Sequence, residues 1–121
     1  MSPNERLPLL IGALLAALGI LFGALGAHGL RAVLSPEALG WWQTGVQYQM
    51  WQALGLIGIG ATRLPGLRLS VWLLALGTLI FSGSLYLLAL TGARWLGMVT
   101  PVGGVLMIAG WVCFSLKLWR R

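Results

Sequence analysis

The sequence predicts an all-α, polytopic membrane protein: a bundle of four transmembrane helices with both termini in the cytoplasm. Only 8% of its 121 residues are charged and 59% are hydrophobic, whereas roughly a quarter of the residues of a soluble domain are charged. The ten charged side chains also leave four uncharged stretches of 22 to 25 residues. Because an α-helix rises about 1.5 Å per residue and a bilayer core is about 30 Å thick, each stretch can cross a membrane once. The predicted spans are residues 7–30, 38–61, 69–91 and 97–117.

These spans take up most of the chain, so residues 1–121 are expected to form a single membrane domain without a separate catalytic domain. The first span follows Arg6 as the apolar core of a secretory signal would, but such a core has about 7–15 residues and this stretch is longer. We therefore expect it to be retained. The net charge of +6 does not indicate a nucleic-acid partner, because the basic residues flank the apolar spans instead of gathering on one accessible face.

The distribution of basic residues predicts the orientation in the inner (plasma) membrane. The two tails and the second connection together hold six basic residues, and the other two connections hold two. Since basic residues collect on the cytoplasmic side, both termini are expected inside. The six are Arg6, Arg63, Arg68, Lys117, Arg120 and Arg121, and the two are Arg31 and Arg94.

Local chemistry predicts several helix ends. Ser35 and Pro36 are typical of a helix N-cap and first helical residue, so the second helix should begin near Pro36. Thr100 and Pro101 can be read either as a helix start or as a break within a longer helix, and the sequence does not choose between them. Three tryptophans near span ends are typical of interfacial anchors. These are Trp72, Trp95 and Trp119.

Small residues recur every three or four positions along the first span, at Gly12, Ala16, Gly19, Gly23 and Ala27. In lipid, helices associate largely by close packing over such small residues. The pattern therefore predicts tight helix–helix contacts. Membrane lipids, a second copy of the chain or another membrane protein are the expected partners.

Polar side chains gather in the half of the spans that is predicted to face away from the cytoplasm. In the second span several share one face and should point toward other helices, because unpaired amides in lipid are costly. They could join helices, or they could line a pocket for a lipid headgroup or small ligand, and both interpretations stay open. That face comprises Thr44, Gln47, Tyr48, Trp51, Gln52 and Gly55. The full set of candidates for a polar or ligand-binding layer is His28, Gln43, Thr44, Gln47, Tyr48, Gln52, Ser82, Ser84, Tyr86 and Thr100.

The polar residues of the spans do not form a recognisable catalytic or metal-binding set. His28 can contact a ligand or simply form hydrogen bonds at a helix end, and one histidine without nearby Cys, Asp or Glu is not a metal site. The interior of the spans holds no Asp, Glu, Lys or Arg, so neither a carboxylate pair nor a Ser-His-Asp set is available. We therefore expect no enzymatic activity and no cofactor.

Four segments occur in order along the chain: residues 23–30 (GALGAHGL), 42–49 (WQTGVQYQ), 81–86 (FSGSLY) and 100–104 (TPVGG) with 109–111 (AGW). Together they resemble the YgdD-like family of bacterial inner-membrane proteins, a domain of unknown function whose eukaryotic relatives are called transmembrane protein 256. The resemblance implies a four-span membrane protein without an established biochemical role, with a suggested link to membrane integrity. The family pattern has a histidine where this chain has Gln52, so a two-histidine site cannot operate here, although Gln52 can still form a hydrogen bond.

The sequence thus favours a non-enzymatic component that supports membrane integrity through contacts with lipids or partner helices. One alternative is a channel or carrier for a small neutral or anionic solute, with recognition by His28, Gln47, Tyr48 and Tyr86. Another is a protein that binds a lipid or quinone against Trp51 and Tyr48.

Overall fold

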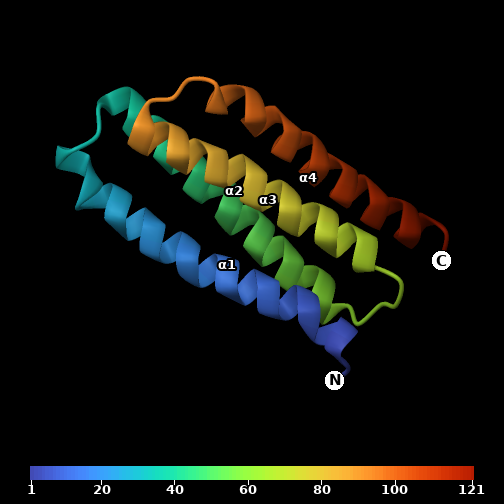
Figure 1. Cartoon of the computed structure of the whole chain (residues 1–121). Helices are drawn as coiled ribbons and strands as arrows, with labels where there is room; N and C mark the ends of the chain where they lie inside the picture. The colour runs from blue at the N-terminus through green and yellow to red at the C-terminus, as the bar shows by residue number, and fades with distance from the viewer.

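The computed structural model describes residues 1–121 and confirms the predicted all-α fold. Four long helices run alternately in opposite directions, and the two chain termini lie at the same end of the molecule (Figure 1). A short 3-10 turn, η1, separates the first two helices. The elements are α1 (Pro3–Ala27), η1 (Leu30–Ala32), α2 (Pro36–Ala61), α3 (Arg68–Thr91) and α4 (Leu96–Trp119).

The helix ends follow from local side-chain chemistry. The Ser35 hydroxyl accepts a hydrogen bond of 3.1 Å from the backbone N–H of Ala38, and α2 begins at Pro36 as predicted. Ser2 caps α1 in the same way, so this helix begins within the predicted N-terminal tail. It ends at Ala27, three residues before the predicted end of the first span. Gly26, His28 and Gly29 surround this end and all have low helix propensity, which explains why the helix ends early.

The structure decides between the two interpretations of Thr100 and Pro101. Helix α4 begins at Leu96, so Pro101 lies inside it and is not its first residue. Proline has no N–H to donate, which leaves the backbone carbonyl four residues earlier without its usual helical partner. The helix nevertheless continues to Trp119.

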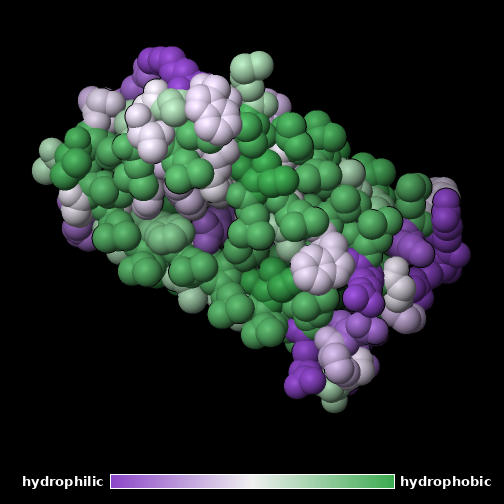
Figure 2. Space-filling model, viewed as in Figure 1, coloured by the Kyte–Doolittle hydropathy of each residue, from purple (hydrophilic) through white to green (hydrophobic).

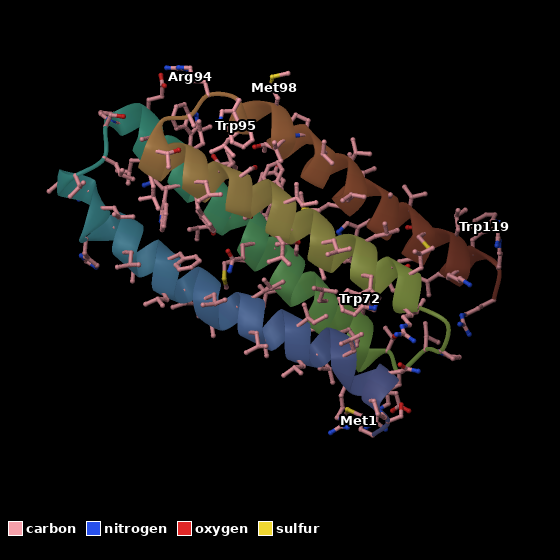
Figure 3. The ribbon with its side chains drawn as sticks, in the orientation of Figure 1. Met1, Trp72, Arg94, Trp95, Met98 and Trp119 are labelled. Atoms are coloured by element: carbon pink, nitrogen blue, oxygen red, sulfur yellow. The ribbon has the colours of Figure 1, made fainter.

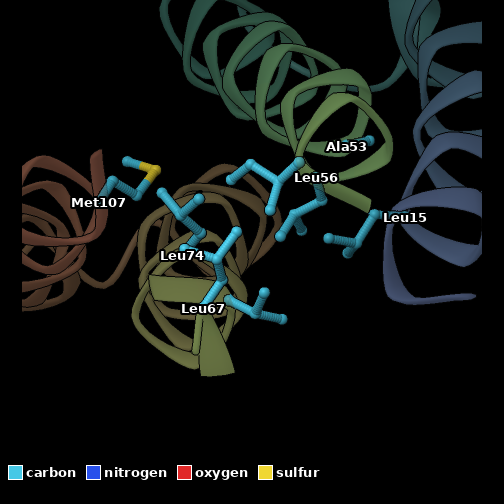
Figure 4. Packing of buried hydrophobic residues seen from close by; sticks show 8 residues of the cluster. Leu15, Ala53, Leu56, Leu67, Leu74 and Met107 are labelled. Atoms are coloured by element: carbon cyan, nitrogen blue, oxygen red, sulfur yellow. The ribbon is translucent and has the colours of Figure 1, made fainter. Parts of the chain in front are cut away.

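The helices pack mainly against their neighbours in the sequence: α1 against α2, α2 against α3, and α3 against α4. Helices α1 and α4 lie on opposite sides of the molecule, so the four helices do not close into a square (Figure 1). Apolar side chains from all four still meet in one central cluster (Figure 4). Leu15 of α1 and Met107 of α4 lie at its two sides, and Leu56 and Leu74 between them are fully buried.

Helix α1 approaches α2 across three buried glycines spaced seven residues apart, Gly12, Gly19 and Gly26. A Cβ atom on Gly12 would lie 2.7 Å from the backbone oxygen of Ala53, and one on Gly26 would lie 2.8 Å from the Trp42 ring. Only glycine permits this approach, because any side chain would push the two helices apart. The predicted tight packing of the first span is therefore confirmed at Gly12 and Gly19, whereas Ala27 of the predicted stripe is exposed and Gly26 makes the close contact instead.

Three helices, α1, α3 and α4, are long and apolar enough to cross a membrane, whereas α2 is as long but too rich in polar residues to join this set. Hydrophobic side chains cover the middle of the visible face, and hydrophilic ones gather at its ends (Figure 2). Many large apolar side chains of the helices are exposed, including Ile20 of α1 and Ile108 of α4 at 66% each. Such a continuous apolar surface suits contact with lipid tails.

The labelled tryptophans lie toward the two ends of the helices (Figure 3). Trp72 and Trp119 lie toward the end that carries Met1, and Trp95 lies at the opposite end beside Arg94. All three are exposed. Amphipathic indole rings at both ends of an apolar belt are typical of the two membrane–water interfaces.

Candidate functional site

A buried glutamine of α2, Gln49, joins α2 to two other helices. Its side chain is only 3% exposed. The amide nitrogen Nε2 donates a hydrogen bond of 2.8 Å to the backbone oxygen of Leu15 in α1. The amide oxygen Oε1 accepts a hydrogen bond of 2.6 Å from the hydroxyl of Tyr86 in α3. One side chain therefore connects three helices through polar contacts.

A second buried glutamine, Gln52, lies about one helical turn further along α2 and reaches the fourth helix. Its amide oxygen accepts a hydrogen bond of 2.8 Å from the indole N–H of Trp111 in α4. The Trp111 ring also packs over Gly55, where a Cβ atom would lie 2.5 Å from the indole. Between them, the two buried amides of α2 form hydrogen bonds to each of the other three helices.

Hydroxyl groups add further links between neighbouring helices. The Ser82 hydroxyl donates a hydrogen bond of 2.7 Å to the backbone oxygen of Gly45, joining α3 to α2. The hydroxyls of Ser84 and Thr100 lie 2.5 Å apart and join α3 to α4. These contacts and those of the two glutamines form what we call the polar layer: Gln49, Gln52, Ser82, Ser84, Tyr86, Thr100 and Trp111.

An aromatic cluster adjoins the polar layer. The indole N–H of Trp42 donates a hydrogen bond of 2.8 Å to the backbone oxygen of Phe22 in α1. The Tyr86 ring packs against both side chains, with ring centroids 4.6 Å from Trp42 and 5.1 Å from Phe22. This packing fixes the direction of the Tyr86 hydroxyl toward Gln49.

Five of the predicted site residues lie outside the polar layer, and three of these are exposed. His28 caps the end of α1 and is exposed, and Gln43 and Gln47 are exposed on the outer face of α2. None of these three side chains forms a hydrogen bond within the chain. The prediction that Gln47 and Trp51 face the other helices is wrong, because Trp51 is also exposed, at 56%.

Two further predicted residues are partly buried at the margin of the helix interface. Thr44 and Tyr48 have intermediate exposure. The Tyr48 ring packs on Phe81 at 4.5 Å between ring centroids and on Trp51 at 5.0 Å. Tyr48 thus packs against α3, and neither residue forms a hydrogen bond between helices.

The sequence analysis did not select Gln49, which holds three helices together, nor Trp42. A signal was present in the sequence, because the buried face of α2 repeats with helical spacing through Trp42, Gly45, Gln49 and Gln52. The small residue Gly45 on this face leaves room for the Tyr86 ring. The small residues of α2 do not select this face by themselves, because Gly40 and Gly58 lie on the exposed side.

A crevice of about 190 Å³ lies beside the polar layer, where α1 and α3 barely touch. Leu15 and Phe22 of α1 line one side, and Ser82 and Tyr86 of α3 line the other. Gln49 lies between them. The accessible surface of the crevice is almost entirely apolar, so it would suit an apolar chain better than a polar solute. No group of three or more His, Cys, Asp or Glu side chains is placed to hold a metal ion.

The apolar belt, the interfacial tryptophans and the helices of membrane-spanning length define an integral membrane protein. A model of the family described as "Protein of unknown function (DUF423)" matches residues 22–104. The chain is 44% identical over 118 residues to the UPF0382 membrane protein SH2409 of Staphylococcus haemolyticus, covering 95% of this chain and 97% of that protein. It is 41% identical over 127 aligned positions to the UPF0382 inner membrane protein YgdD of Escherichia coli, covering 98% and 95%.

The chain therefore belongs to the DUF423 family, and the predicted resemblance to YgdD-like proteins is confirmed. A further relative is the UPF0382 membrane protein YwdK of Bacillus subtilis, which is 42% identical over 109 residues, covering 86% of this chain and 89% of that protein. The names of these relatives and the apolar helices also confirm the predicted location in the inner membrane. No solved structure matches the chain.

Proposed function

We propose that this protein is a non-enzymatic, four-span component of the inner membrane that supports membrane integrity by binding partner helices, and that its first partner is a second copy of itself. The observation that carries the proposal is a pair of glutamines, Gln43 and Gln47. Both are exposed on the outer face of α2 and have no hydrogen-bond partner within the chain. Both chain termini lie in the cytoplasm in this proposal.

The packing of α2 supports its assignment as a membrane span in addition to α1, α3 and α4. With 26 residues it is about 39 Å long, and it lies between α1 and α3 along their length. A helix packed in this way shares the depth of its neighbours in the bilayer. Its low hydropathy comes largely from glutamines, two of which are buried with their amide oxygens hydrogen-bonded. The excess of basic residues at the end with the termini supports the cytoplasmic orientation.

The contacts of the polar layer support an interhelical role for these groups over a ligand-binding one. The amide oxygens of Gln49 and Gln52 and the hydroxyl of Tyr86 are already used in hydrogen bonds between helices. Such bonds are worth about 1 kcal/mol or less each in membrane proteins, but several together fix the arrangement of the helices. A rigid core of this kind suits a protein that presents a fixed outer surface to a partner.

That outer surface is a stripe of exposed residues along α2, spaced three or four positions apart between Gly40 and Gly58. Gln47 follows Pro36 by eleven residues, or about 16 Å, which places it near the middle of the helix. An unpaired amide facing lipid tails costs several kcal/mol, so a hydrogen-bonding partner is expected there. An amide both donates and accepts, so Gln47 can pair with its own copy across a two-fold axis. The stripe comprises Gly40, Gln43, Gln47, Trp51, Leu54 and Gly58.

The test replaces both exposed amides. The wild-type chain is expected to be a dimer by native mass spectrometry from mild detergent and by photobleaching in bilayers. The double variant Gln43→Leu, Gln47→Leu is expected to be a monomer with an unchanged helix content, and the double Asn variant, which keeps the amides, should remain a dimer. A monomeric wild type, or a dimeric leucine variant, would refute pairing through α2.

The role in membrane integrity is tested in cells. Cells that lack the protein should take up a membrane-impermeant dye faster than the parent strain, and the wild-type gene should restore the barrier. The leucine double variant should not restore it, although it reaches the membrane in equal amount. Unchanged dye entry in the deletion strain would contradict the proposed role. For the orientation, a reporter fused after Arg121 that is active outside the cytoplasm would contradict the topology.

A second candidate function follows from the crevice between α1 and α3. Its apolar walls, with the Gln49 amide and the Ser82 hydroxyl beside them, suit a lipid chain or a quinone. Mass spectrometry of the purified protein would detect such a molecule, and Leu18→Trp, which fills the crevice, should reduce its amount. The channel alternative is tested by solute flux in proteoliposomes, where flux above that of empty vesicles would favour it.

A further inference from the structure

A pocket of about 330 Å³ lies at the end of the molecule that carries both termini. The starts of α1 and α3, the end of α2 and the α2–α3 connection form it. Its floor is apolar and buried. The floor residues are Pro8, Ile59, Leu67 and Val71.

The rim of this pocket is polar and carries two arginines, Arg63 from the α2–α3 connection and Arg68 from the start of α3. Both are exposed, and neither forms an ion pair. Ser2 and Asn4 add further polar groups, and Glu5 adds one negative charge. The rim therefore combines two free guanidinium groups with hydrogen-bonding groups directly above an apolar floor.

The charge around the pocket is largely uncompensated. This end of the chain carries six basic side chains against the single carboxylate of Glu5. The ion pair of the chain, Arg94 with Glu37 at 3.2 Å, lies at the opposite end. The Arg121 guanidinium donates a hydrogen bond of 2.5 Å to the backbone oxygen of Pro65, which also lines the pocket, so the basic C-terminus is held beside it.

We propose that this pocket binds the phosphate-bearing headgroup of an anionic membrane lipid. The guanidinium groups of Arg63 and Arg68 contact the phosphate, since arginine pairs readily with phosphate oxygens. The apolar floor covers the glycerol and the first acyl carbons. Basic pockets between the cytoplasmic ends of membrane helices are a common form of lipid site. This inference rests on the proposed depth of the helices in the bilayer, but not on pairing through α2.

The experiment compares two variants that each remove two positive charges from the same end of the full-length protein. In the first, Arg63→Gln with Arg68→Gln, the charges come from the pocket rim. In the second, Lys117→Gln with Arg120→Gln, they come from the C-terminal tail outside the pocket. Native mass spectrometry measures the ratio of bound phosphatidylglycerol to bound phosphatidylcholine after both lipids are added in equal amounts.

The wild type and the tail variant are expected to prefer phosphatidylglycerol equally. The rim variant should lose at least tenfold of this preference, because each basic side chain near an anionic surface contributes roughly fivefold. Glu5→Gln, which removes the opposing carboxylate, should raise the preference. All variants are compared at equal helix content. The double variant Arg63→Lys, Arg68→Lys, which keeps both charges, should keep much of the preference for phosphatidylglycerol.

Equal losses in the rim and tail variants would overturn the proposal, because they would show diffuse attraction to the basic end and no site. An unchanged preference in the rim variant would overturn it as well. A second measurement adds inorganic phosphate or glycerol 3-phosphate as a competitor of the bound lipid. If either displaces the lipid at millimolar concentration, or binds as tightly, the pocket takes a free phosphate and the lipid assignment is wrong. A monomeric wild type would leave this result unaffected, so the two proposals fail separately.

Discussion

Replacing Gln49 by leucine should destabilise the protein without unfolding it. The substitution removes the hydrogen bond of 2.8 Å to the Leu15 carbonyl and the bond of 2.6 Å from the Tyr86 hydroxyl. Individual hydrogen bonds between membrane helices average about 0.6 kcal/mol and reach about 1.7 kcal/mol. The Tyr86 hydroxyl also loses its partner, which adds about 1 kcal/mol. We therefore expect Gln49→Leu to lower the free energy of unfolding by about 2–3 kcal/mol.

The assay is equilibrium unfolding in mixed micelles of a mild detergent and sodium dodecyl sulfate, followed by the fluorescence of the seven tryptophans. A double-mutant cycle with Tyr86→Phe should give a coupling energy of about 0.5–1.7 kcal/mol, because the two side chains share one bond. Gln47→Leu is the matched control on the exposed face of the same helix, and all variants are measured at a protein-to-detergent ratio low enough to keep the chain monomeric. If it costs as much as Gln49→Leu, or if Gln49→Leu costs less than about 0.5 kcal/mol, the argument from the polar layer is refuted.

Three further predictions use the same unfolding assay. Gly12→Ala should lower the free energy of unfolding by about 1–3 kcal/mol, because its Cβ would meet the α2 backbone. Gly58→Ala, which has open space around it, should be neutral or stabilising by up to about 1 kcal/mol. Equal effects of the two substitutions would contradict the packing of α1. Ser70→Ala should stabilise by about 1 kcal/mol, because the buried Ser70 hydroxyl has no hydrogen-bond partner, and a clear loss of stability would reveal an unseen one. Trp111→Phe should cost about 1 kcal/mol by leaving the Gln52 amide oxygen unpaired, and Gln52→Leu should cancel most of that added cost.

The sequence predicts the secondary structure well because it depends on local signals. Spans of uncharged residues, the Ser35 cap and the glycines of the first span each act within one or two helical turns, and the structure has all of them. The burial of Gln52, Ser82 and Ser84 was also expected, since polar groups in lipid need partners.

The sequence does not show which side of α2 faces inward, because polar residues occur on several sides of this helix. Gln47 and Gln49 have the same chemistry, yet one is exposed and the other is buried. What separates them lies elsewhere in the chain: the glycines of α1 and the Tyr86 ring shape the surface against which α2 packs. His28 shows the same limitation, because an early helix end leaves it exposed on the tip of α1.

The order of packing has a consequence for how the chain is made. Helices that follow one another in the sequence pack together, so a nascent chain emerging from the ribosome forms each new contact as soon as the next segment enters the bilayer. The carbonyls of Leu15 and Phe22 are in place before the glutamine and tryptophan that bind them are synthesised. Insertion and assembly can thus proceed together, hairpin by hairpin, without waiting for the C-terminus.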